Sequence, residues 1–306
     1  MRLAVMSCIA AALVLPSIAT AAPPRVTQPS ASRSGAAQKA KPRWQTLPLP
    51  PAMPSPRDKG FVEVDGAQIY YARFGAAGEP VILLHGGMGN ADHWSHQVKA
   101  LADKLQVIAI DSRGQGRSTR TKAKPSYDQM AEDVIAVMDK LELKKASLVG
   151  WSDGGEIALK LAIQHPDRVA KLFILGSNYD AKGSKPRRGP LPATFAAYAA
   201  KCRADYRKMS RTPKQYDDVQ AWLVPIWRNP MGFTKDQLRA IAAPTIVADG
   251  DHDEIIELAQ VEEMAKLIPN ARLEVFADTS HFALWQDPEA VNNVLLDFLA
   301  PAAPAK

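Results

Sequence analysis

From residue 60 onward, short apolar runs alternate with longer stretches in which apolar residues recur at helical spacing. The runs are continuous, as in strands that are covered on both faces. They span 80–84, 105–110, 147–150, 171–175, 244–248 and 272–276. The helical patterns between them span 93–104, 127–141, 154–165, 256–267 and 288–299. This alternation predicts an α/β fold with a mostly parallel central sheet flanked by helices.

Two regions depart from the alternation. Residues 61–66 and 68–73 alternate polar and apolar positions around a glycine turn, which predicts a hairpin. No buried strand is expected between 177 and 243, where helical patterns at 194–208 and 216–227 carry many aromatic residues. We interpret about 181–237 as a helical cap inserted over the carboxyl edge of the sheet, since a disordered excursion would not need those aromatics.

The N-terminus has the pattern of a signal peptide over residues 1–21. Arg2 precedes an apolar run from Leu3 to Leu15 that is too short to span a bilayer, and Ala19-Thr20-Ala21 fits a cleavage site. A membrane anchor or a buried helix is the alternative. The pattern predicts export to the periplasm or beyond, a mature chain that begins near Ala22, and no stable insertion into the membrane.

Residues 22–58 are rich in proline, alanine, serine and basic side chains, with almost no large apolar groups before Trp44. Such a segment cannot bury enough surface to fold by itself. We therefore expect a disordered linker over 22–58, followed by one folded domain over 59–302.

The net charge of +6 is unevenly placed. Residues 1–59 carry eight Lys and Arg against Asp58 alone, which is +7, so the other 247 residues sum to −1. A folded domain without a basic excess is not expected to bind nucleic acid. Cys8 would leave with the signal peptide, and Cys202 alone cannot form an internal disulfide.

The stretch Leu148–Gly155 reads as a buried strand, a tight turn and a helix, with the pattern G-x-S-x-G at the turn. In such an elbow the serine, here Ser152, occupies a strained conformation that exposes its hydroxyl. Gly150 and Gly154 would flank it because a Cβ would clash where helix and strand pack closely. The pattern predicts a nucleophile, and the alternative is a tight turn with an inert serine.

A serine nucleophile needs a base, and the base needs an orienting acid. Polar residues that follow the strands of a parallel sheet meet at its carboxyl edge. Asp253 follows the run at 244–248, and His281 follows the run at 272–276. Ser152, Asp253 and His281 have the chain order Ser, Asp, His that accompanies this kind of elbow.

Five motifs together resemble the α/β-hydrolase superfamily over about residues 60–300. They are the segments that begin at His85, Asp111, Gly150, Pro244 and Ser280. The resemblance implies Ser152 as nucleophile, Asp253 as acid and His281 as base. It also implies an oxyanion hole from the backbone N–H groups of Asp153 and of Gly87 or Met88.

Other residues could take some of these roles. Asp180 follows the preceding strand, where some relatives carry the acid, whereas Asp249 and Asp251 are interpreted as loop and turn residues. His85 is expected to brace the oxyanion loop. His252 lies between two aspartates, but adjacent residues in a loop rarely point at one ion, so no metal is expected.

The remaining polar residues of these motifs are interpreted as structural. Asp111 and Arg113 are expected to hold their loop by charge-assisted hydrogen bonds. His93, His96 and His165 fall on predicted helices and are given no role. The run Gly86–Gly89 lacks the Gly-Lys-Ser/Thr of a phosphate loop, and no dinucleotide fingerprint follows the first parallel strand.

The sequence thus predicts an exported serine hydrolase that cleaves an ester or related acyl bond of a small to medium substrate without a cofactor. Amide or amino-acid ester cleavage, lactone opening, carbon–carbon bond hydrolysis and perhydrolysis stay open on the same residues. A non-catalytic binding protein is a further alternative. Epoxide and haloalkane hydrolases are disfavoured because they carry aspartate at the elbow. The oligomeric state stays open.

Trp151 and Asp153 flank the serine and are candidate substrate-binding residues. The carboxylate of Asp153 would stabilise the start of the helix that follows. Alternatively it would point into the pocket and pair with a substrate cation. The string Gly-Trp-Ser-Asp-Gly-Gly resembles that of valacyclovir hydrolase-like members of the superfamily, which implies a preference for α-amino acid esters.

Overall fold

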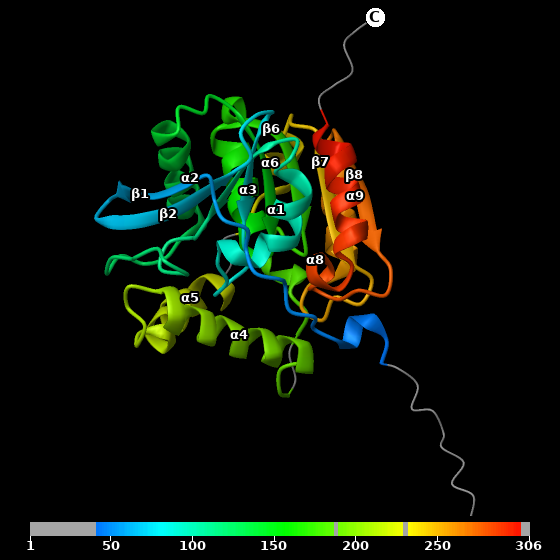
Figure 1. Ribbon diagram of the computed structural model, residues 1–306. Coiled ribbons are helices and arrows are strands. Elements are labelled where there is room, and N and C mark those ends of the chain that lie inside the picture. Colours follow the sequence, from blue (N-terminus) through cyan, green and yellow to red (C-terminus); the bar gives the residue numbers. More distant parts are fainter. Residues whose placement is uncertain (1–40, 187–188, 229–231, 301–306) are drawn as a thin grey trace, which may run out of the picture. The chain divides into compact units, whose positions relative to one another are not determined.

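The computed structural model describes residues 41–186, 189–228 and 232–300. Within these ranges eight strands form one sheet in the order β1-β2-β4-β3-β5-β6-β7-β8 (Figure 1). β1 pairs antiparallel with β2, β2 pairs antiparallel with β4, and every other pairing is parallel. The prediction of a mostly parallel α/β sheet is therefore confirmed.

Each apolar run of the sequence corresponds to a strand. The runs at 80–84 and 105–110 become β3 and β4, and the expected hairpin becomes β1 and β2. The strands are β1 (Asp58–Val64), β2 (Ala67–Phe74), β3 (Pro80–Leu84), β4 (Gln106–Ile110), β5 (Ala146–Trp151), β6 (Val169–Leu175), β7 (Thr245–Gly250) and β8 (Ala271–Phe276). All six residues of β5 and of β7 are buried, which explains why their sequences show no polar alternation.

Helices flank the sheet. α1 packs against α9, α2 packs against α3, and α3 also contacts β3, β5 and β6. The core helices are α1 (Ser95–Leu101), α2 (Tyr127–Lys140), α3 (Asp153–Gln164), α7 (Leu258–Leu267), α8 (Ala283–Gln286) and α9 (Pro288–Leu299). Short 3-10 turns are η2 (Ala91–Trp94), η3 (Pro166–Arg168) and η4 (Ala181–Gly183). The helix expected from His93 begins at Ser95, because η2 precedes it and is capped by Asn90.

The turn between β5 and α3 depends on two glycines. A Cβ on Gly154 would overlap the carbonyl oxygen of Leu84 in β3, and a Cβ on Gly150 would overlap the backbone of Gly154. Helix α3 therefore touches the sheet backbone with no side chain between them. This close approach requires glycine at both positions, as the sequence pattern predicts.

The region expected as a cap contains α4 (Ala193–Met209), α5 (Tyr216–Arg228) and α6 (Lys235–Arg239). α4 and α5 contact each other and lie together at one edge of the sheet, drawn in yellow-green in Figure 1. The aromatic side chains that mark this region in the sequence include Tyr198 and Tyr216, which are buried. Cys202 is buried beside them.

The expectation of a flexible linker up to residue 58 does not hold for residues 41–58. η1 (Arg43–Gln45) opens a segment that lies against the loops after β7 and β8, and we call residues 41–57 the strap. The Arg43 guanidinium pairs with Asp287 at 2.6 Å, and the Trp44 ring stacks on His252 with centroids 4.6 Å apart. A few such anchors fix an extended segment, and composition does not reveal them.

Residues 1–40 lie outside the described residues, and with them the predicted signal peptide and the first half of the predicted linker. Among the helices that the structure describes, none has both the length and the apolar character needed to cross a bilayer.

The strap should contribute measurably to stability. Trp44→Ala removes the stacked ring pair and should lower the free energy of unfolding by about 1 kcal/mol, the order of one aromatic pair. Leu49→Ala is the matched control, because the side chain of Leu49 is 61% exposed. It should change stability by less than about 0.5 kcal/mol. Chemical denaturation measures both, and equal effects would show that the strap only rests on the surface.

Candidate active site

A cavity of about 550 Å³ lies where the carboxyl ends of the central strands face the cap. Ser152 and His281 line it, together with the loop Gly86–Met88 that follows β3. The cap closes it with aromatic and aliphatic side chains, among them Phe195, Tyr198, Ile226 and Trp227. The structure thus brings the predicted nucleophile, base and oxyanion loop to one concave site, the usual form of a small-molecule site.

Ser152 has the backbone conformation that the elbow pattern predicts. Its φ of 54° and ψ of −124° are strained for a residue with a Cβ. The N–H of Ser152 donates to the Leu175 carbonyl at 2.9 Å, and the Ser177 hydroxyl donates to the Ser152 carbonyl at 2.8 Å. These contacts from the end of β6 hold the strained turn in place.

His281 is fixed through both its ring and its main chain. Its Nδ1 donates to Oδ2 of Asp253 at 2.6 Å, in a pair that is almost fully buried. Its N–H donates to Glu254 at 3.1 Å, and its carbonyl accepts from the Trp151 indole at 2.8 Å. Because Nδ1 is engaged, Nε2 is the ring nitrogen left for a reacting proton.

The Asp253 carboxylate is held on both oxygens. Oδ1 accepts the N–H groups of Ile255 and Ile256 at 2.6 and 2.8 Å, which leaves Oδ2 facing His281. Burial alone would raise the pKa of Asp253, but the charge and hydrogen bond of His281 lower it below its ordinary value. Burial likewise would lower the pKa of His281, and Asp253 raises it above 6.5.

Of the four acids considered from the sequence, Asp253 is the one that contacts the His281 ring. Asp180 caps η4 and accepts from the Gln260 amide at 2.6 Å. Asp251 accepts from the His252 ring at 2.7 Å. Asp249 is not a loop residue as expected, but lies fully buried in β7.

The oxyanion loop is shaped from both sides. The Tyr198 hydroxyl, on the cap helix α4, donates to the Gly87 carbonyl at 3.0 Å, and Met88 adopts a φ of 60°. Asp153 opens α3, so its backbone N–H has no partner within the helix. The N–H groups expected to bind an oxyanion therefore belong to segments that line the same cavity.

His85 braces this loop as expected. Its Nδ1 donates to the Gly86 carbonyl at 2.7 Å and its Nε2 accepts the N–H of Ser112 at 3.0 Å. Burial lowers its pKa to about 3, so the ring is neutral at physiological pH. Asp111 and Arg113 also hold backbone segments. Asp111 accepts the N–H groups of Ala91 and Arg117 at 2.6 and 2.7 Å, and Arg113 donates to the Val64 carbonyl at 3.1 Å.

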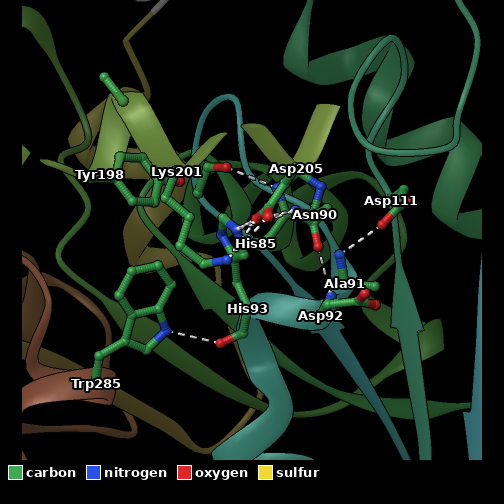
Figure 2. Close-up of polar contacts among 12 residues, drawn as sticks. His85, Asn90, Ala91, Asp92, His93, Asp111, Tyr198, Lys201, Asp205 and Trp285 are labelled. Atoms are coloured by element: carbon green, nitrogen blue, oxygen red, sulfur yellow. Dashed lines mark hydrogen bonds and ion pairs between the residues drawn. The ribbon is translucent and has the colours of Figure 1, made fainter. Parts of the chain in front are cut away.

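A partly buried polar network joins the cap to the core (Figure 2). Asp205 of α4 accepts from His93 Nε2 at 3.0 Å and from the Asn90 amide at 3.3 Å, and it pairs with Lys201 at 2.9 Å. Burial would raise the pKa of Asp205, but His93 and Lys201 lower it to about 2. His93, which the sequence left without a role, is therefore a link between the two regions.

The Asp153 carboxylate is buried and faces the cap. The Trp227 indole of α5 donates to its Oδ2 at 2.9 Å. Glu156, one turn further along α3, is also buried, and the Tyr127 side chain lines the same cavity beside both carboxyls. Burial raises the pKa of Asp153 and, more strongly, that of Glu156, and proximity to Asp153 adds to the rise at Glu156.

Several residues that shape the site carry no signal in the sequence. Tyr198 and Trp227 contact the motif residues from the cap helices, and their distance along the chain hides the contact. Glu254 and Glu156 are near the motif residues in the chain, but the sequence does not show that Glu254 binds the His281 N–H or that Glu156 is buried. Trp151, expected to bind substrate, lines the cavity and also supports His281. Among the described residues, no cluster of three or more His, Cys, Asp and Glu could hold a metal ion.

The fold and the site define a class, that of hydrolases built on an α/β sheet with a serine at the elbow. Residues 79–202 and 195–288 match the alpha/beta hydrolase fold family, and the chain belongs to this family.

Two curated relatives match most of the chain. A putative carbamate hydrolase, RutD, from Caulobacter vibrioides is 30% identical over 265 residues, which cover 78% of this chain and 97% of that protein. A non-heme haloperoxidase from Rhodococcus erythropolis is 31% identical over 267 residues, covering 77% and 97%.

Two solved structures share the fold and have names that describe different activities. An N-acyl homoserine lactone degrading enzyme is 32% identical, with a TM-score of 0.61 over 78% of this chain and 99% of that chain. A meta-cleavage product hydrolase from Pseudomonas fluorescens has a TM-score of 0.69 over 78% and 96%, and at 21% identity it shows the fold alone.

The His281–Asp253 pair should be visible in a titration. The imidazole of His281 should titrate above 6.5, because the Asp253 carboxylate outweighs the effect of burial. Asp253→Asn removes that charge and leaves the burial, so the pKa should fall below 6.5. An NMR pH titration of the histidine ring protons measures the pKa in the wild type and in the variant, and the loss of one signal in His281→Ala assigns it. An unchanged pKa in Asp253→Asn would contradict the pairing.

Proposed function

We propose that this chain is a serine hydrolase that cleaves an ester or a related acyl bond of a small to medium substrate. Ser152, His281 and Asp253 form its catalytic triad. The observation that carries the proposal is that the strained serine and the buried His281–Asp253 pair meet in one cavity. Membership of the alpha/beta hydrolase family supports it.

In this mechanism the Ser152 Oγ attacks the substrate carbonyl while His281 Nε2 takes the hydroxyl proton. Asp253 stabilises the imidazolium that forms. The carbonyl oxygen becomes an oxyanion on the N–H groups of Asp153 and of Gly87 or Met88. His281 then returns the proton to the leaving group, and the acyl group stays on Ser152. Water, deprotonated by His281, releases the acid and restores the serine.

The substrate class follows from the cavity and from the relatives. A volume of about 550 Å³ with aromatic walls admits a molecule of metabolite size. One relative is named as a putative carbamate hydrolase and one solved structure as an N-acyl homoserine lactone degrading enzyme, and both names favour a carbonyl substrate for this chain. A relative named as a non-heme haloperoxidase keeps perhydrolysis as an alternative reaction on the same residues.

A second candidate function is the cleavage of esters that carry a cationic group, such as amino-acid esters. Asp153 and Glu156 are two buried carboxyls on the cavity wall, and the side chains described beside them, Trp227 and Tyr127, are neutral. A substrate ammonium would supply the positive charge that this pair lacks. It would also offset the repulsion between Asp153 and an oxyanion bound beside Gly87.

The triad predicts complete dependence on one hydroxyl. Ser152→Ala should lower kcat on p-nitrophenyl esters by at least about 10³-fold without changing the fold. A fluorophosphonate probe should label the wild type and not this variant. Ser55→Ala is the control, because Ser55 is exposed in the strap and should keep both activity and labelling. Ester turnover by Ser152→Ala within tenfold of the wild type would reject the triad.

The second candidate predicts a substrate preference. Amino-acid esters should exceed their des-amino analogues in kcat/KM by at least about tenfold, since a desolvated charge pair is stronger than an exposed one. Asp153→Asn keeps the shape and removes the charge, so it should erase the preference and leave acetate esters nearly unaffected. Equal wild-type rates on both ester types would leave Asp153 with its structural role alone.

We also propose that the chain is exported, on the strength of the leader pattern in residues 1–21. Mass spectrometry of protein recovered from outside the cytoplasm should show a chain that begins near Ala22. Retention of the leader in the mature protein would contradict this.

A further inference from the structure

Asp249 is a buried carboxyl that the mechanism does not use. It is the penultimate residue of β7, and its exposed fraction is 0%. Its Oδ1 accepts the N–H of Gly250 at 2.8 Å, whereas its Oδ2 has no conventional donor among the described residues. A buried carboxyl oxygen without a donor is costly unless it carries a proton and donates in turn.

The chain after β7 folds back so that a second carboxyl meets the first. The N–H of Asp253 donates to the carbonyl of Gly250 at 3.1 Å, which closes a tight turn. Gly250 permits this turn to press against the loop of His281, because a Cβ there would crowd the carbonyls of Thr279 and Ser280. This turn brings the side chain of Asp253 within interaction distance of the Asp249 carboxyl, whose Oδ2 is the oxygen left without a conventional donor.

Two carboxyls in contact must share a proton, and their surroundings decide which of them holds it. Asp253 has two N–H donors on Oδ1 and the imidazole N–H on Oδ2. Asp249 has one N–H donor. The negative charge is therefore better stabilised on Asp253, and the proton belongs to Asp249.

We propose that Asp249 is a neutral, proton-donating partner of Asp253, and that it acts as a positioning residue which extends the proposed triad by one member. Its Oδ2–H donates to the Asp253 carboxylate, keeps that group ionised and orients Oδ2 toward His281. No proton leaves Asp249 during the reaction. The proposal rests on the triad of the proposed function.

The charged groups around Asp249 agree with this assignment. Burial raises the pKa of Asp249 well above its ordinary value, and the charge of Asp253 raises it further. Lys185 opposes the rise, but its ammonium group donates to the main-chain carbonyl of Asp253 rather than to either carboxyl. His281 lies on the far side of Asp253, bonded to Oδ2.

Two variants of similar size test whether Asp249 acts as a hydrogen-bond donor to Asp253 or only fills space in the core. Asp249→Asn keeps a donor and stays neutral, so kcat should remain within about threefold of the wild type. The acidic limb of kcat/KM against pH should not move, because no charge is lost. Asp249→Leu has no donor. It should lower kcat about tenfold and shift the acidic limb to higher pH. Without the hydrogen bond from Asp249, the full negative charge of Asp253 acts on His281 and raises the pKa of the imidazole.

The matched control is Thr245→Val, which removes a buried hydrogen bond at the other end of β7. It should lower the melting temperature and leave the pH profile unchanged. A shift of the acidic limb of kcat/KM to lower pH in Asp249→Asn would mean that Asp249 carries a negative charge in the wild type. This result would overturn the proposal. So would an Asp249→Leu enzyme that differs from the wild type only in melting temperature.

A readout without turnover keeps the test separate from the proposed function. The proton between His281 Nδ1 and Asp253 should give a downfield NMR resonance, assigned by its loss in His281→Ala. Asp249→Asn should leave its position unchanged, and Asp249→Leu should move it. If Ser152→Ala keeps its activity, the triad fails while this resonance still decides the role of Asp249. If Asp249→Leu leaves the resonance in place, the present proposal fails and the triad stands.

Discussion

The contact between helix α3 and the backbone of the sheet constrains the rest of the site. Gly154 touches the Leu84 carbonyl with no side chain between them, so the chain must turn within one residue at Ser152. That residue takes a positive φ, and bonds from the end of β6 hold it there. The packing of three parallel strands and one helix keeps Ser152 in its strained conformation. The stability of the core therefore offsets the backbone strain at this residue.

The cap is bonded to the same residues that it covers. Tyr198 donates to the oxyanion loop, Trp227 donates to the carboxylate beside the serine, and Asp205 joins α4 to His93 (Figure 2). A side chain that defines the pocket wall thus also holds the residues next to Ser152 in place. Changes in the cap are therefore expected to alter rate and selectivity together.

The sheet and the elbow could be predicted from the sequence, because each depends on a local pattern. The order Ser152, Asp253, His281 could also be predicted, because each of these residues follows a strand end. The sequence alone left Asp180 and Asp253 both open, and only the position of His281 decides between them. The sequence predicts a loop position for Asp249, since an aspartate is not expected at the end of a fully buried strand, whereas the structure places it in β7. Its partner lies four residues on, beyond a turn whose geometry the sequence does not specify.

The strap redefines where the folded unit begins. A chain cut at residue 59, the boundary that composition suggests, would lose the stack of Trp44 on His252 and the bonds from Gln286 to the Thr46 carbonyl. Gln286 also accepts the N–H of Ser280, next to His281. The loops that carry Asp253 and His281 are thus buttressed by a segment from the opposite end of the sequence. Any proteolytic trimming of the N-terminal region must stop before Arg43 to leave that buttress intact.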